Sequence, residues 1–384
     1  MQEHCSIIGT ILTGINRKLF KRIVDKYNGD RYVKYFNCWS LFVCILIGQI
    51  ANLKSIREIV DTINFQPNNQ YHIGIKKNIS KSTFAEANER TNWRIFRDVF
   101  LKLIAQLPQK IQLEVENLVK IIDSSPIRLD LTNHTWAEKT QRIEGIKLHL
   151  MYDLNNALPT YFEFTGARTN DIEIGKKMDI QKGCTYVFDK GYMDFNWWSD
   201  IDDKGAYFVT RLKRNNAIIE LSKIQENSEL VSSQLIRLKN KNLCHSGRNR
   251  CNEKILRKVV VKREDTRPLI LVTNDLNRSA EEIAELYKQR WQIELFFKWI
   301  KQNLKIKKFL GRSENAVKTQ ICIALISYIL IYMAEEIKKV CRNISLKNLL
   351  KLIGNNLFTT LKVRKYGRKR LKDPNQLQFQ WVFF

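Results

Sequence analysis

Residues 118–123 read Leu-Val-Lys-Ile-Ile-Asp, and residues 185–189 read Thr-Tyr-Val-Phe-Asp. Each stretch is a short run of branched or aromatic side chains that ends on an aspartate, which is typical of a buried strand with a carboxylate where it leaves the sheet. Further segments share this β-rich composition: 143–152, 160–165 and 206–212. Others have the period of a helix: 171–180 and 194–202. The chain around the two aspartates therefore predicts a mixed five-stranded sheet with helices packed on it.

The order of these elements is three strands, then helix, strand, helix and strand, which is the order of a ribonuclease-H-like α/β fold. We predict that residues 113–212 form the first part of such a core. Residues 213–267 are polar, with one β-like run at 255–262, and are predicted to be an inserted subdomain. A strand at 269–273 and the helix after it return to the core, so its second part is predicted at 268–312.

The two flanking regions are predicted to be helical. In residues 1–112, apolar residues recur at helical spacing, and Ser55 and Ser80 begin helices on either side of a turn-like stretch. This pattern is compatible with a helix-turn-helix whose second helix carries the candidate DNA contacts Lys81 and Arg90, and equally with simple helix packing. Residues 313–384 are predicted to be a helical C-terminal region with a basic tail.

Composition limits the possible classes of protein. The chain has 384 residues, 44% of them hydrophobic and 27% charged, which excludes collagen-like and disordered polymers. Its formal charge of +26 favours nucleic acid as a partner. The longest apolar runs are shorter than the roughly 18 residues that span a bilayer, so we expect a soluble, intracellular protein that does not span a membrane. Eight scattered cysteines indicate reduced thiols, and Cys244, His245 and Cys251 lack convincing zinc spacing.

The helix after residue 279 has a polar face that suits an active site. Ser279 and Glu282 form a predicted capping box, and the helix is expected to continue to about Leu304. Four of its polar residues, which could bind a ligand or take part in a reaction, fall within an arc of about 60° on a helical wheel: Tyr287, Arg290, Glu294 and Lys301. An apolar stripe lies beside them, so packing this stripe on the sheet would direct the polar side chains to the sheet edge.

Asp123, Asp189 and Glu294 together predict a site of three carboxylates. Hard divalent cations prefer oxygen ligands, and two Mg²⁺ ions held this way serve phosphoryl transfer. The alternative is that the aspartates begin turns and that the glutamate is a solvated helix residue.

The motifs Asp123-Ser-Ser, Asp189-Lys-Gly-Tyr192 and Tyr287-x2-Arg290-x3-Glu294-x6-Lys301 together resemble those of the DDE transposases of the insertion-sequence-four family. This resemblance implies that the three acids are catalytic and hold two Mg²⁺ ions, with Mn²⁺ as a substitute. It also implies that Tyr287, Arg290 and Lys301 bind terminal phosphates. Lys298, in the basic run that follows, is a further candidate DNA contact.

The resemblance also implies a reaction and its partners. The family moves DNA by cut and paste, often through a hairpin, and we expect a homodimer assembled on the element's terminal inverted repeats and on target DNA. Relatives that form hairpins stack a flipped base on a tryptophan of the insertion, whereas this chain has no tryptophan between Trp198 and Trp291. Two alternatives remain: a DNA-binding repressor derived from a transposase, and a ribonuclease-H-like nuclease without strand transfer. The three intact acids argue against the repressor.

Overall fold

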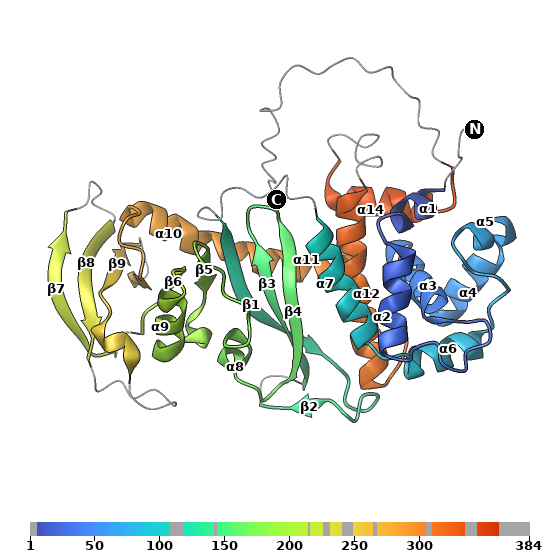
Figure 1. Ribbon diagram of the computed structural model, residues 1–384, viewed down its shortest axis with the longest axis horizontal. Helices are drawn as coiled ribbons and strands as arrows, with labels where there is room; N and C mark the ends of the chain where they lie inside the picture. Colours follow the sequence, from blue (N-terminus) through green and yellow to red (C-terminus); the bar gives the residue numbers. More distant parts are fainter. Residues whose placement is uncertain are drawn as a thin grey trace, which may run out of the picture.

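The computed structural model describes residues 6–107, 118–141, 144–213, 216–225, 231–239, 249–263, 267–304, 309–334 and 344–360. Figure 1 shows a large sheet on the left and in the centre of the molecule and a group of helices on the right. The fold is thus of the mixed α/β type, as predicted.

The five predicted core strands are present and lie side by side in the order β4-β3-β1-β5-β6. β1, β3 and β4 form an antiparallel meander, whereas β5 runs parallel to β1 and β6 runs parallel to β5. These neighbours and directions agree with the strand order expected for a ribonuclease-H-like core. The bounds of the strands are β1 Val119–Arg128, β3 Glu144–Asp153, β4 Leu158–Gly166, β5 Thr185–Phe188 and β6 Tyr207–Arg211.

Within the described residues, however, the sheet has ten strands, more than the five predicted for the core. A two-residue strand, β2 (Glu138–Lys139), pairs with β3, and on the other side β10 pairs with β6 and continues through β9 and β8 to β7. β10 is the strand predicted at 269–273 in the second part of the core, and it satisfies the backbone donors and acceptors at the outer edge of β6. The strands of the predicted insertion, β7, β8 and β9, then extend the sheet beyond β10. Their bounds are β7 Ile218–Ile224, β8 Val231–Leu238, β9 Leu256–Val261 and β10 Leu269–Thr273.

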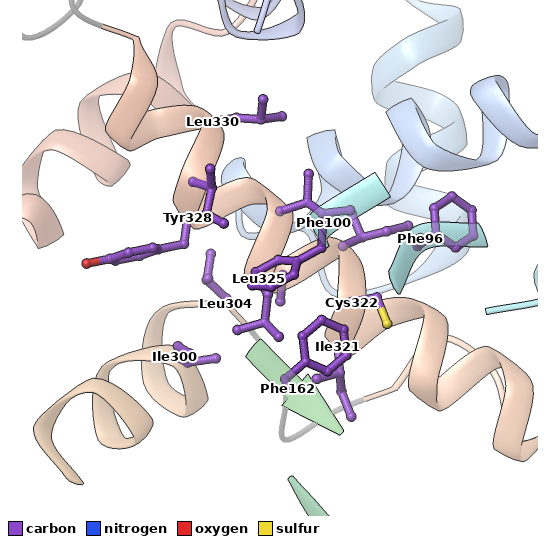
Figure 2. Packing of buried hydrophobic residues seen from close by; sticks show 14 of the residues in the cluster. Phe96, Phe100, Phe162, Ile300, Leu304, Ile321, Cys322, Leu325, Tyr328 and Leu330 are labelled. Carbon is purple, nitrogen blue, oxygen red and sulfur yellow. The ribbon is translucent and has the colours of Figure 1, made fainter. Parts of the chain in front are cut away.

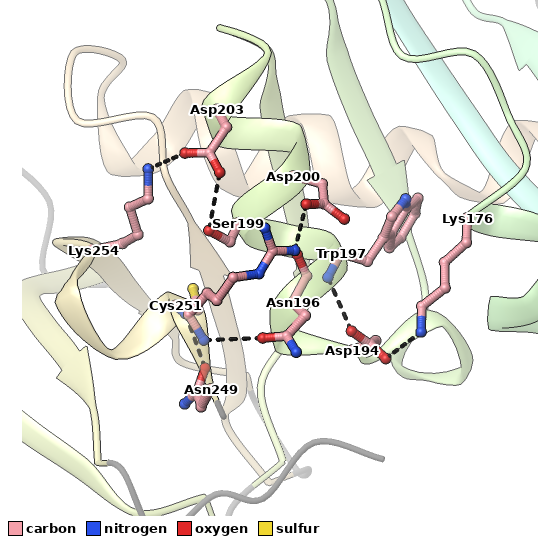
Figure 3. Close-up of polar contacts among 11 residues, drawn as sticks. Lys176, Asp194, Asn196, Trp197, Ser199, Asp200, Asp203, Asn249, Cys251 and Lys254 are labelled. Carbon is pink, nitrogen blue, oxygen red and sulfur yellow. Dashed lines mark hydrogen bonds and ion pairs between the residues drawn. The ribbon is translucent and has the colours of Figure 1, made fainter. Parts of the chain in front are cut away.

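Polar contacts attach the extended part of the sheet to helix α9 (Phe195–Asp203) (Figure 3). Arg250, in the short helix η4 (Arg250–Glu253), pairs with Asp200 at 2.5 Å, and its backbone N–H donates to Asn196 Oδ1. Lys254 pairs with both Asp202 and Asp203. The acidic helix α9 thus obtains its counter-ions from the inserted segment.

Helices cover both faces of the sheet. α8 (Asp171–Gly175) and α9 pack on the face to which Ile122 points, and α8 ends earlier than the predicted residue 180. α10 (Ala280–Gln289) and α11 (Trp291–Asn303) pack on the opposite face with Ile121. The alternation of the two isoleucines across β1 separates the two hydrophobic clusters.

The single helix predicted from Ser279 to Leu304 is divided at Arg290. The capping box of Ser279 and Glu282 is confirmed. At the junction, the Arg290 N–H donates to the Tyr287 carbonyl, and the Ile293 N–H donates to the Arg290 carbonyl, both at 3.2 Å. These bonds span three residues instead of four, so they tighten the backbone locally without ending its helical course.

The N-terminal region is all-helical, and Ser55 and Ser80 cap α4 and α6 as predicted. Between them, the stretch predicted to be a turn contains a third short helix, α5, which begins at Pro67 because proline fits the first helical position. The bounds are α1 Ile7–Leu12, α2 Arg17–Lys26, α3 Cys38–Ile50, α4 Ile56–Asn64, α5 Pro67–His72, α6 Lys81–Arg90 and α7 Arg94–Gln106.

The C-terminal helices complete the core of the N-terminal region. α12 (Glu314–Met333) packs against α3, α6, α7 and β4, and α14 (Leu346–Asn355) packs against α3. All thirteen residues of α3 are buried, and in Figure 2 side chains from α7, β4, α11 and α12 meet in one cluster. α12 is long and apolar enough to span a membrane by length and composition, but 83% of its apolar window is buried inside the protein. It therefore serves here as a core helix.

Candidate active site

The register of two parallel strands places the two aspartates at one level of the sheet. Ile122 on β1 lies opposite Phe188 on β5, so Asp123 and Asp189 are the next residues on adjacent strands. Asp189 leaves the sheet there and precedes a short 3-10 turn at Lys190. Asp123, by contrast, does not end its strand as predicted, because β1 continues to Arg128 through antiparallel pairing with β3.

The division between α10 and α11 delivers Arg290 and Glu294 to the same place. Arg290 Nη1 donates to Asp123 Oδ2 at 3.1 Å, and Arg290 Nη2 donates to Glu294 Oε1 at 2.6 Å. Asp123 Oδ1 also accepts the Ser124 N–H at 2.8 Å. One guanidinium therefore bridges two of the three predicted catalytic carboxylates.

The remaining two polar residues of the helix face contact the two strands directly. Tyr287 O–H donates to Asp189 Oδ1 at 3.2 Å. Lys301 Nζ donates to Ser125 Oγ at 2.7 Å and to the Pro126 carbonyl at 2.8 Å. The arc predicted on the helical wheel is thus turned toward β1 and β5.

Asp123, Asp189 and three polar residues of the helix face, Arg290, Glu294 and Lys301, line a cavity of about 520 Å³ at the edge of the sheet, whereas Tyr287 is not part of its lining. The sequence prediction included most of its lining, but it missed Ser124, Ser125, Phe297 and Gln302, none of which is charged. Its full lining is Asp123, Ser124, Ser125, Asp189, Arg290, Glu294, Phe297, Lys298, Lys301 and Gln302. Lys298 is exposed.

Other predicted residues lie elsewhere. Lys81 and Arg90 are exposed at the two ends of α6, outside this cavity. Trp291 is 56% exposed because it begins α11 on the side away from the apolar stripe, whereas Trp299 packs on Tyr328. Cys244 and His245, which lack convincing zinc spacing, and the basic tail lie outside the described residues.

The electrostatics of the cavity favour bound cations. The pKa of Asp123 is raised to about 6, chiefly by burial; the Ser124 N–H and the charge of Arg290 oppose this rise, and the charges of Glu294 and Asp189 add to it. For Arg290, burial lowers the pKa, but the hydrogen bond that it donates to Glu294 and the charge of Asp123 outweigh burial and raise the pKa overall. Negative charge is therefore costly here unless a cation accompanies it.

Tyr192 of the Asp189-Lys-Gly-Tyr192 motif is a packing residue. It is 1% exposed and contacts Phe188 and Trp197 on the face of the sheet away from the cavity. His149 lies on that face too, opposite Ser124 on β1, and its Nε2 is hydrogen-bonded to Thr165 Oγ1.

The donor set suits divalent metal ions, although its present arrangement is not a closed coordination sphere. Three carboxylates from separate elements line one cavity, and hard cations take such oxygen ligands. Among the residues that the structure describes, no three acidic, histidine or cysteine side chains are gathered closely enough to share an ion. Arg290 stands between Asp123 and Glu294. Asp123, Asp189 and Glu294 are the residues that would hold metal once the guanidinium moved.

Residues 116–330, more than half of the chain, match the family model described as "Transposase DDE domain", and residues 3–76 match a "Domain of unknown function (DUF4372)". The chain belongs to the DDE transposase family and is a DNA-cleaving transposase of the insertion-sequence type. The family predicted from the sequence motifs is confirmed.

Named relatives agree with this class. The chain is 37% identical over 265 residues to "Putative transposase y4zB" of Sinorhizobium fredii, covering 67% of this chain and 72% of that protein. It is 30% identical to "Probable transposase for insertion sequence element IS5377" of Geobacillus stearothermophilus over 59% of each chain. Among solved structures, a piggyBac transposase synaptic complex with hairpin DNA aligns at a TM-score of 0.45 and 13% identity, covering 95% of this chain and 80% of that one. That likeness is too distant to assign a role to any residue.

Proposed function

We propose that this transposase moves an insertion sequence by cut and paste, with two Mg²⁺ ions held by Asp123, Asp189 and Glu294. The observation that carries the proposal is that the three acids line one cavity together with the cations Arg290, Lys298 and Lys301. Carboxylates suit the metals, and the cations suit the phosphates of a DNA strand.

Each residue has a separate task in this proposal. The carboxylates fix the position of the metals, and Arg290 and Lys298 orient the scissile phosphate by charge and hydrogen bonding. Tyr287 holds Asp189 in place through its hydroxyl. When bound, the two Mg²⁺ ions supply activation of the attacking oxygen and stabilisation of the leaving oxygen.

The wider proposal concerns the partners and the sequence of cuts. We propose that the DNA substrate is the terminal inverted repeat of the element and then its target. The protein acts as a homodimer on DNA, because both ends of an element must be joined, and it works at the nucleoid of a bacterial cell. A hairpin follows the first cut. Mn²⁺ can substitute for Mg²⁺ as the metal. The exposed cations Lys81 and Arg90 on α6 contribute DNA contacts.

The test is a cleavage assay on an end-labelled duplex that carries the terminal repeat found beside the reading frame, with nick, hairpin and joined product resolved on one gel. Asp123→Asn, Asp189→Asn and Glu294→Gln should each abolish all Mg²⁺-dependent products while retaining binding of the duplex. The matched control is Glu285→Gln on α10, an exposed residue paired only with Lys288 among the described contacts, which should cut normally. Normal cutting by any active-site variant would remove that residue from the site.

The same gel separates the alternatives. A nuclease without strand transfer would give nicks but no joined product from the unaltered protein. A repressor would bind the repeat and give no product at all.

A further inference from the structure

Arg290 is hydrogen-bonded to two of the carboxylates that metal ions would need as ligands. Its guanidinium donates to Asp123 and to Glu294 at the same time, with the side chain only 16% exposed. Both partners are acids that we propose as metal ligands. Arg290 and metal therefore compete for the same oxygen atoms.

The guanidinium is not fully satisfied in this position. Its Nε is buried and has no hydrogen-bond partner among the described residues. A buried donor without an acceptor is unfavourable, and an arginine can offer its donors in pairs to a phosphate. Arg290 is thus held by two carboxylates but retains an unused donor for a third acceptor.

The surroundings provide a reason for that acceptor to be a phosphate. Two further cations, Lys298 and Lys301, line the same cavity, and Lys298 is exposed at its surface. A DNA strand entering the cavity brings negative charge close to three carboxylates, which is unfavourable unless cations enter with it or move toward it.

We propose that Arg290 is an exchangeable counter-ion that makes metal binding depend on DNA. Without DNA it neutralises Asp123 and Glu294. When DNA binds, the guanidinium donates its hydrogen bonds to a phosphate of the strand instead of to Asp123 and Glu294. The two released carboxylates can then bind metal. This inference rests on the proposed two-metal function and adds a regulation of the same site.

Linkage gives the proposal a definite sign. If DNA releases the carboxylates, DNA must raise the affinity for metal, and metal must raise the affinity for DNA by the same factor. Removing Arg290 should then increase the metal affinity of the DNA-free protein, although the same change weakens DNA binding. A residue that only grips phosphate would leave the metal affinity of the DNA-free protein unchanged.

The experiment is calorimetric titration of the full-length protein with Ca²⁺, with and without a 40-base-pair duplex of the terminal repeat. A gel of the same samples verifies that no cleavage occurs. In the unaltered protein we expect the duplex to tighten Ca²⁺ binding about tenfold. In Arg290→Gln we expect DNA-free binding to be about tenfold tighter than in the unaltered protein, with less than about twofold further change on adding the duplex.

Lys298→Gln is the matched control, because it removes one positive charge from the same cavity. No ion pair links Lys298 to a carboxylate in the described part of the chain. We expect its DNA-free Ca²⁺ affinity to change less than about threefold and its response to the duplex to persist. If Arg290→Gln proves unstable by its melting temperature, Arg290→Lys replaces it, since one ammonium lacks the paired fork that bridges two carboxylates. Without DNA, Arg290→Lys should then bind Ca²⁺ more tightly than the unaltered protein but less tightly than expected for Arg290→Gln.

Two negative results have different meanings. If Arg290→Gln bound Ca²⁺ no more tightly than the unaltered protein, or if the duplex tightened its binding just as much, the exchange would be refuted and the metal site would stand. If the unaltered protein bound no Ca²⁺ even with the duplex, the proposed metal-dependent function would itself fail, and the exchange with it.

Discussion

Lys301 offers a direct comparison between a structural role and a DNA-binding role. The family resemblance implies that it grips a phosphate, whereas in the structure its ammonium binds Ser125 and the Pro126 carbonyl on β1. This contact joins α11 to the part of β1 just beyond Asp123. Lys301→Met keeps most of the aliphatic chain and removes only the donors.

The contacts set the expected magnitude. A hydrogen bond from a charged donor contributes about 1.5–3 kcal/mol net, and a partly exposed pair lies at the lower end. Because Lys301 is only half-buried and makes two such bonds, we expect Lys301→Met to lower the free energy of unfolding by about 2–3 kcal/mol. Lys298→Met, on the exposed side of the same helix, should change it by less than about 0.5 kcal/mol.

Two measurements separate the roles: urea unfolding, and the affinity for the terminal-repeat duplex as a function of salt. Each lysine that neutralises a phosphate contributes about 0.9 to the slope of log affinity against log salt. We expect Lys298→Met to reduce this slope by about one and Lys301→Met to leave it nearly unchanged. If Lys301→Met unfolded like the unaltered protein but lost one unit of slope, the assignment would be reversed.

Three further predictions test the fold. Burial lowers the pKa of His149 to about 4, so below pH 6.5 the unfolded chain binds a proton that the folded protein does not. Stability then falls as the pH falls from 6.5 to 4, and urea unfolding should show that His149→Gln removes about 3 kcal/mol of this loss; an equal loss in the variant would contradict the assignment. Phe162→Ala removes the partner of Phe100, 4.9 Å away between ring centres, and should cost about 3–5 kcal/mol in one cooperative transition, whereas two separate transitions would disprove a shared core. Lys254→Ala breaks only partly exposed ion pairs, so thermal unfolding should show a loss of less than about 1 kcal/mol in the free energy of unfolding. A larger loss would show that these pairs anchor the inserted strands.

The sequence predicted the residues of the site because each has a local signal. Asp123 and Asp189 follow apolar strands, and the parallel register of β1 and β5 then brings them together. The helix cap at Ser279 and the 100° rotation per residue were enough to place Glu294 and Arg290 on one face. What the sequence could not show is that Arg290 bridges Asp123 and Glu294, since that depends on a side-chain conformation chosen in three dimensions.

The differences between the predicted and the observed fold have physical causes that a local sequence pattern does not carry. β1 continues through Ser124, Ser125 and Pro126 because β3 pairs with it along its whole length. β7 was missed because most of its side chains are exposed, so no alternating apolar pattern marks it. The packing of α12 against α3 and α7 joins segments far apart in the chain, and no local pattern reports such a contact.

The burial of α3 on every side has a consequence during protein synthesis. Its partner α12 begins about 260 residues after α3 ends, and ribosomes add about 5–20 residues per second. The apolar surface of α3 therefore remains without α12 to cover it for on the order of ten to fifty seconds. A polypeptide that terminates within the sheet would expose this helix permanently, so prematurely ended copies of the gene should yield aggregating or rapidly degraded fragments instead of smaller folded proteins.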